Sequence, residues 1–322
     1  MDATLTRPRA DASRRVEKLS QASLRKIIDP DVDLPGEVGP GQVLPDELLS
    51  IPELPEFAGL SAEQRATLSR EEIASIVEAG LRFEAVLMAG FAHEIVAAPD
   101  LTDPRVVYAL HEVGEETRHS RLFSRLLAQL SPSARNPLAV LRPVELFVVR
   151  QIIRRPALLS VLVLGGEEIP DLMQKLAMEH GDTDPFIREV NRYHRSEEAR
   201  HLAFARTVLA EQWRDAGVFE RFLVRFVVAR VIWGMFDTIV HPGVYATVGL
   251  PKFSTWRRAN RSPYRVGLRR RAARPIVKAT LDAGVLRAGR IPRAWRATPH
   301  APRRRRMPRC GRRAGRRVRA RR

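Results

Sequence analysis

Residues 111–123 read HEVGEETRHSRLF, and residues 193–201 read YHRSEEARH. Each stretch contains one Glu-x-x-His pair, Glu116–His119 in the first and Glu198–His201 in the second, and the two pairs lie 82 positions apart. Because a helix turns about 100° per residue, the two members of each pair face the same side of a helix. This repeated pattern is typical of the ligands of a carboxylate-bridged two-metal site in a four-helix bundle.

Each pair also has a single glutamate about 31 residues upstream, Glu84 before the first and Glu167 before the second. Both upstream glutamates lie in apolar sequence, FEAVLMAGF and LLSVLVLGGE. A buried carboxylate without a partner is very costly, so a bound cation explains this placement economically. The spacing to the second pair favours Glu167 over its neighbour Glu168. His194, four residues before Glu198, adds a third imidazole to the same helix face.

Helical periodicity dominates the chain from Ser61 onward, and no continuous strand pattern competes with it. We expect an all-α fold with a four-helix bundle core and additional helices. A capping-box-like sequence at Ser69 predicts the start of the first long helix. The helices are expected over residues 69–98, 104–130, 144–179 (interrupted or kinked near Pro156 and Pro170), 185–214, 219–240 and 266–283. In the two resulting hairpins, all the candidate ligands lie at nearly the same height.

The net charge of +18 conceals a division of the chain. Residues 252–322 contain 26 Lys and Arg and one acid, whereas residues 1–251 contain 29 bases and 36 acids. We expect an extended N-terminal arm over residues 1–60 with one helical turn at 17–26, a metal-binding domain over 61–297, and a disordered basic tail over 298–322. The single cysteine, the absence of a signal sequence and the lack of a long apolar segment predict a cytoplasmic protein without a membrane partner.

At these residues the chain resembles the p-aminobenzoate N-oxygenase family of ferritin-like diiron oxygenases. The resemblance covers roughly residues 20–297 and includes ASLRKIIDP and RRANRSPYRVGLRR. It implies a ferritin-like bundle, two iron ions cycling between Fe2+ and Fe3+, O2 and a small organic substrate as reactants, and an electron donor. It also implies seven metal ligands: Glu84, Glu116, His119, Glu167, His194, Glu198 and His201. Manganese is the alternative metal. The expected reaction is N-oxygenation of an arylamine.

Three other functions compete with this interpretation. A C-hydroxylase or desaturase would use the same centre. A ferritin-like ferroxidase or iron-storage protein would share the bundle, but the arm and the additional apolar helix argue against it. The total charge suggests a nucleic-acid-binding protein, although the body is acidic and the tail would bind polyanions without sequence preference. The apolar residues 219–240 would either complete the core or form a dimer interface, and we favour a homodimer.

Several neighbouring residues have less definite roles. Arg118 and Arg200 occupy matching places in the two pairs, and either orientation of ligands through carboxylates or simple surface exposure fits them. Glu115, Glu168 and Glu197 are neighbouring acids that could be mistaken for ligands, since acids on helices are usually solvated. His93, His111 and His241 are expected to be structural, because none has a glutamate three positions before it. Tyr108 and Tyr193 are expected to pack in the core.

Overall fold

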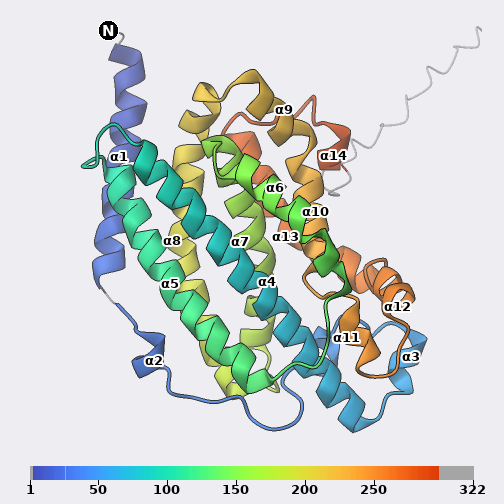
Figure 1. Cartoon of the computed structure of the whole chain (residues 1–322). Helices are drawn as coiled ribbons and strands as arrows, with labels where there is room; N and C mark the ends of the chain where they lie inside the picture. Colours follow the sequence, from blue (N-terminus) through green and yellow to red (C-terminus); the bar gives the residue numbers. More distant parts are fainter. Residues whose placement is uncertain (1–2, 26, 297–322) are drawn as a thin grey trace, which may run out of the picture.

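The computed structural model describes residues 3–25 and 27–296, which form helices and loops without a β-strand (Figure 1). The prediction of an all-α fold is therefore confirmed. Four long helices form the central bundle: α4 (Ala62–Ala97), α5 (Pro104–Leu130), α7 (Pro156–Glu179) and α8 (Pro185–Asp215). Helices α4 and α5 form one antiparallel hairpin, α7 and α8 form the other, and the two hairpins pack against each other.

Polar side chains set the first residues of these helices. Ser61 and Gln64 form a capping box at the start of α4, in which the Ser61 hydroxyl accepts from the Gln64 amide at 3.2 Å. The expectation that α4 begins at Ser69 was wrong: Ser69 lies within the helix, and its buried hydroxyl accepts from the Val43 amide at 3.0 Å. The start of α5 is capped by Asp103, as the Asp-Pro sequence predicts.

The remaining predicted helices occur with changed boundaries. The chain breaks between α6 (Arg142–Ile152) and α7, whereas α7 continues through Pro170. The predicted apolar helix over 219–240 is two helices, α9 (Val218–Phe226) and α10 (Val228–Thr238). The predicted basic helix is α13 (Pro263–Asp282). Three short helices complete this part of the chain: α11 (Gly243–Ala246), α12 (Lys252–Ala259) and α14 (Arg293–Arg296).

The N-terminal region differs most from the expectation of an extended arm. Helix α1 (Ala3–Arg25) packs against α5 and α8, because its buried residues Val16, Ser20 and Ser23 recur at helical spacing on one face. The chain then runs through loops and the short elements α2 (Pro30–Asp33), η1 (Asp46–Leu48) and α3 (Pro55–Ala58). The predicted disordered tail over 298–322 lies outside the described residues.

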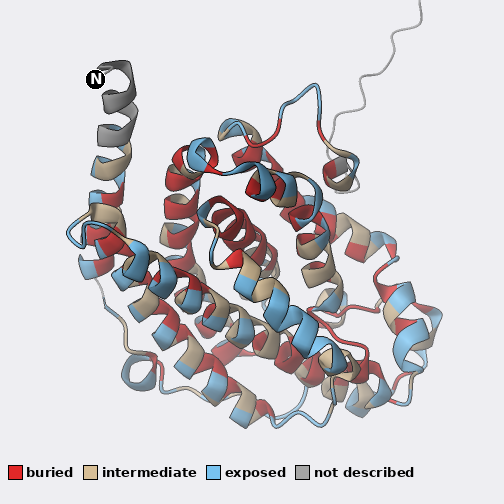
Figure 2. Cartoon of the chain, turned by 45° about the horizontal axis from the view of Figure 1, so that its top comes forward, coloured by how far each residue is buried: buried red, intermediate tan, exposed pale blue. Residues whose placement is uncertain are grey.

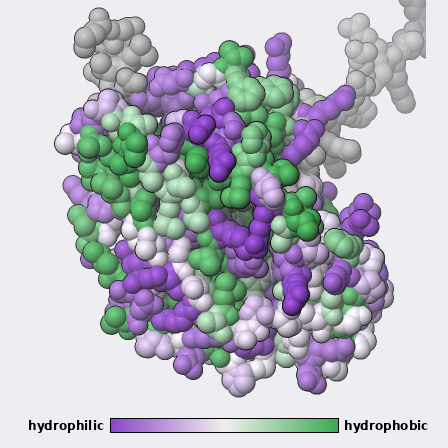
Figure 3. All heavy atoms as spheres, viewed as in Figure 1, coloured by the Kyte–Doolittle hydropathy of each residue, from purple (hydrophilic) through white to green (hydrophobic). Residues whose placement is uncertain are grey.

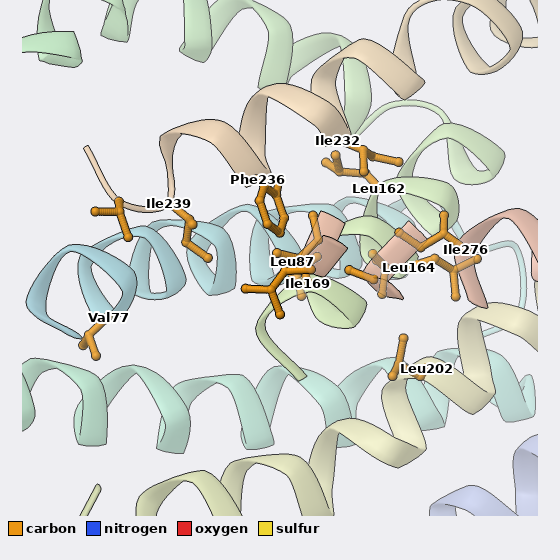
Figure 4. Packing of buried hydrophobic residues seen from close by; sticks show 14 of the residues in the cluster. Val77, Leu87, Leu162, Leu164, Ile169, Leu202, Ile232, Phe236, Ile239 and Ile276 are labelled. Atoms are coloured by element: carbon orange, nitrogen blue, oxygen red, sulfur yellow. The ribbon is translucent and has the colours of Figure 1, made fainter. Parts of the chain in front are cut away.

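A second layer of helices covers α7 on the side away from α8. Helices α10 and α13 pack against α7, and Phe236 and Ile276 meet Leu164 and Ile169 in a continuous apolar core (Figures 2 and 4). A close approach between α4 and α7 depends on Gly166, where an added Cβ would lie 1.8 Å from the Phe83 ring. This approach brings the helices that carry Glu84 and Glu167 together.

Helix α6 lies over the bundle with much of its apolar surface facing outward. Val144, Leu146 and Phe147 are exposed, and hydrophobic side chains are visible in the upper part of the molecule where α6 and α9 lie (Figure 3). Among the described residues, no helix is long and apolar enough to cross a membrane.

Candidate metal centre

All seven predicted ligands lie within the bundle, and each is at most 2% exposed. One glutamate comes from each of α4 and α7, one Glu-x-x-His pair comes from each of α5 and α8, and α8 adds a third histidine. Two sets of donor atoms are close enough to hold a cation each, and the sets share Glu198: Glu84, His119, His194 and Glu198 in the first, and Glu116, Glu198 and His201 in the second. Glu167 lies beside this second set, where Glu198 and Glu116 act on it electrostatically.

Two carboxylates span the distance between the two sets. The Glu116 oxygens lie 3.2 Å from His119 Nδ1 and 3.2 Å from His201 Nδ1. The Glu198 oxygens lie 3.2 Å and 3.1 Å from the same two nitrogen atoms. Each carboxylate therefore offers one oxygen to each histidine, which is the arrangement that allows a carboxylate to bridge two cations. A ligand set of this kind, with oxygen and imidazole donors, suits iron.

His194 belongs to the first set and approaches it through Nε2. That atom lies 3.3 Å from Glu84 Oε1 and 3.6 Å from Glu198 Oε1. On the other side of the ring, Nδ1 lies 3.1 Å from the amide oxygen of Gln174, which fixes the ring orientation. Burial, reinforced by the nearby His119, lowers the pKa of His194 to about 4, so its imidazole is neutral and can bind a metal at neutral pH.

The charge balance of the cluster fits bound cations. Burial, followed by the neighbouring carboxylates Glu116 and Glu198 respectively, raises the pKa of Glu84 and of Glu167 well above the ordinary value. Glu84 Oε2 and Glu167 Oε1 are buried without a hydrogen-bond partner among the described residues, whereas Oε1 of Glu116 and Oε1 of Glu198 face His201 and His119. Divalent cations would satisfy these oxygens and remove the mutual repulsion.

A second layer of charged residues holds the histidines from outside. His119 Nε2 donates to Glu197 at 3.0 Å, and His201 Nε2 donates to Glu115 at 2.7 Å. The outward nitrogen of each imidazole is thereby engaged, and the lone pair of Nδ1 is directed into the cluster. Glu115 and Glu197 are buried, unlike most acids on helices.

The same layer answers the question left open for the two arginines. Arg200 donates to Glu115 at 2.8 Å and Arg118 donates to Glu197 at 3.3 Å, so both arginines pair with carboxylates that orient histidines. The sequence contained a signal for this layer: the full repeat is Glu-Glu-x-Arg-His, at 115–119 and at 197–201, rather than Glu-x-x-His alone.

The other candidate residues lie outside the two sets. Glu168 pairs with Arg206, whereas Glu167 lies beside the second set. The buried His241 accepts from the Gly243 amide at 3.1 Å, and His93 is exposed. Tyr108 packs on Phe204 with ring centroids 4.6 Å apart.

An apolar cavity of about 530 Å³ adjoins the first set of donors. Glu84, Glu167 and His194 form part of its wall, and the rest is mostly apolar. Helix α6 contributes Val144, Val148, Val149 and Ile152 to the wall, together with Leu141, the residue just before the helix. A small apolar molecule in this cavity would lie beside three of the seven candidate ligands.

Comparison with known proteins agrees with the metal site that the geometry indicates. The family model described as p-aminobenzoate N-oxygenase AurF matches residues 9–284. An uncharacterized protein of Mycobacterium bovis and two uncharacterized proteins of Mycobacterium tuberculosis strains are each 26% identical to the chain over 245 residues, which is 72% of this chain and 72% of each relative. No solved structure matches the chain.

Proposed function

The chain belongs to the p-aminobenzoate N-oxygenase family, and from this premise we propose that it is a non-haem diiron oxygenase that N-oxygenates a small arylamine. Membership of this family implies a diiron oxygenase. The identity of the metal in this chain, the residues that bind it and the substrate are our proposal. The main observation behind this proposal is the position of Glu116 and Glu198. Each has one oxygen close to His119 and the other close to His201.

The ligands divide between two iron positions. Glu84, His119 and His194 would hold the first iron, Glu167 and His201 would hold the second, and Glu116 and Glu198 would bridge them. The chemistry supplied by two reduced irons in this setting is the activation of dioxygen. Manganese fits the same oxygen and nitrogen donors, so the choice of iron rests on the three imidazoles and on the family.

The protein's own residues keep this chemistry in a fixed and dry place. Glu115 and Glu197 hold two imidazoles in the orientation that directs Nδ1 inward, and Gln174 holds the third with Nε2 inward. The mostly apolar lining of the cavity disfavours water beside the wall that Glu84, Glu167 and His194 form. Exclusion of water protects a reactive centre from side reactions.

The cavity also favours a particular state of the substrate. An apolar wall disfavours a charged ammonium group, whereas the amino group of an arylamine is neutral at ordinary pH and keeps the lone pair that is oxidised. Insertion of one oxygen atom into an amine supplies fewer electrons than the full reduction of O2 consumes. An external electron donor is therefore required. A cytoplasmic location and a homodimeric state stay predictions from the sequence.

Iron content tests the metal part of the proposal. Protein loaded anaerobically with ferrous iron and desalted is expected to hold about two irons per chain, in line with other bundles of this ligand type. Substitution of His194→Ala or Glu198→Ala should lower that value, whereas His93→Ala, an exposed histidine outside the cluster, should leave it unchanged. Metal content that is insensitive to the first two substitutions would contradict the proposal.

Product analysis by mass spectrometry tests the reaction. The iron-loaded protein is incubated with O2, a chemical reductant and a panel of arylamines. Oxygen added to nitrogen supports N-oxygenation. Oxygen on carbon identifies a hydroxylase, loss of two hydrogens identifies a desaturase, and iron oxidation without any organic product identifies a ferroxidase.

A further inference from the structure

Glu112 is a buried carboxyl group for which the described structure offers no partner. It lies on α5, one turn before Glu116 and one turn after Tyr108. Its side chain is fully buried, and neither carboxyl oxygen has a hydrogen-bond partner among the described residues. A carboxyl group in this environment is very costly, and so requires an explanation beyond packing.

The internal repeat of the bundle indicates what Glu112 corresponds to. Helices α5 and α8 carry the same Glu-Glu-x-Arg-His sequence at 115–119 and 197–201. Four residues before the second glutamate of this repeat, α8 has His194 and α5 has Glu112. Because both helices are regular over these residues, Glu112 occupies on α5 the place that His194 occupies on α8. His194 is a ligand of the first metal position.

The two metal positions are otherwise unequal. Apart from the bridging carboxylates, the first has three donors, Glu84, His119 and His194, whereas the second has only Glu167 and His201. The charged group that acts most strongly on Glu112 is His201, which belongs to the second position, and the bridging carboxylates Glu116 and Glu198 come next. A carboxylate from Glu112 would give both positions the same number of protein ligands.

We propose that Glu112 is a further metal ligand, which serves the second position beside His201. This inference rests on the two-metal site of the proposed function. Without a cation, the buried carboxyl group of Glu112 is unfavourable. A cation in the second position would remove that cost.

The test uses the full-length protein with Co2+ as a spectroscopic probe, in place of turnover. Substitution of Glu112→Met keeps the length of the side chain and removes the carboxyl group. Two changes are expected together. The metal-free variant should melt at a higher temperature than the wild type, because a buried unpartnered carboxyl group has been removed. One of the two Co2+ ions should bind at least about tenfold more weakly, since even residues that only orient a ligand contribute that much.

Control variants separate this role from others. Glu72→Gln alters another fully buried glutamate, which Ser50 and not the metal cluster contacts, and should leave both Co2+ affinities unchanged. Tyr108→Phe tests whether Glu112 serves the tyrosine instead, and should likewise leave Co2+ binding unchanged. If Glu112→Met does not fold, Glu112→Gln decides, because its amide keeps the shape and is a poorer ligand than a carboxylate.

Unchanged Co2+ affinity and visible absorption in the Glu112 variants would overturn the inference while leaving the proposed function intact. A wild-type protein that binds no Co2+ would overturn both. Loss of Co2+ affinity in Tyr108→Phe as large as in Glu112→Met would also overturn the ligand role, because the tyrosine would then be the group that matters.

Discussion

Replacement of Glu115 by glutamine should weaken one of the two iron positions selectively. Glu115 accepts from His201 Nε2 at 2.7 Å and from Arg200 at 2.8 Å. Glutamine can still accept from the imidazole, but it lacks the negative charge that makes Nδ1 a stronger donor to a cation. It also leaves Arg200 with a weaker partner in a buried place.

The expected magnitude follows from the role of such outer carboxylates. Loss of a residue that orients a metal-bound histidine typically lowers metal affinity about 10- to 100-fold, which corresponds to about 1.4 to 2.7 kcal/mol. The effect should fall on the position at His201. Glu197→Gln should weaken the position at His119 by less, since that hydrogen bond is longer at 3.0 Å.

Anaerobic titration with Fe2+ and a competing chelator measures the two affinities separately. The wild type and Glu168→Gln, in which the altered buried glutamate faces Arg206 instead of the cluster, should give the same isotherm. The Glu115 variant should bind the first iron as the wild type does and the second more weakly. Equal affinities in the wild type and the Glu115→Gln protein would refute the reasoning that Glu115 sets the strength of His201 as a ligand.

Three further predictions concern stability. Gly166→Ala should lower the free energy of unfolding by about 1–3 kcal/mol, because the new Cβ would overlap the Phe83 ring, and Phe83→Leu should restore part of the loss in denaturant titrations. Ser61→Ala should cost about 1 kcal/mol through loss of the capping box, measured in the same way; no change would place the start of α4 elsewhere. Burial raises the pKa of Glu72 to about 7 in the folded state. The contribution of Glu72 to the free energy of unfolding is therefore greatest at low pH and is lost as pH rises toward and through 7. The stability of Glu72→Gln relative to wild type should increase over that range, and a constant difference would contradict this prediction.

The sequence was sufficient to predict the bundle and the positions of the seven candidate ligands within it. Helix periodicity and the Asp-Pro starts are local properties, and the ligand spacing follows from the turn of a helix. The start of α4 was misplaced because a capping box is a short pattern that occurs by chance, and both Ser61 and Ser69 fit it.

Other features depend on contacts between distant residues, which a single sequence does not specify. Helix α1 packs against α5 and α8 and buries Val16 completely, and nothing in the local sequence indicates the surface that covers it. The contacts of Glu115 and Glu197 were not predicted from the sequence. Only the crossing of α5 and α8 places each of them against a histidine of the other helix.

Helix α6 lines the cavity from one side and contributes none of the seven candidate ligands, all of which come from α4, α5, α7 and α8. Replacement of these α6 side chains would change the shape of one part of the cavity without removing a candidate ligand. If the proposed oxygenase activity is correct, residues 142–152 are therefore a segment in which directed evolution can vary the accepted molecules while the ligands are retained.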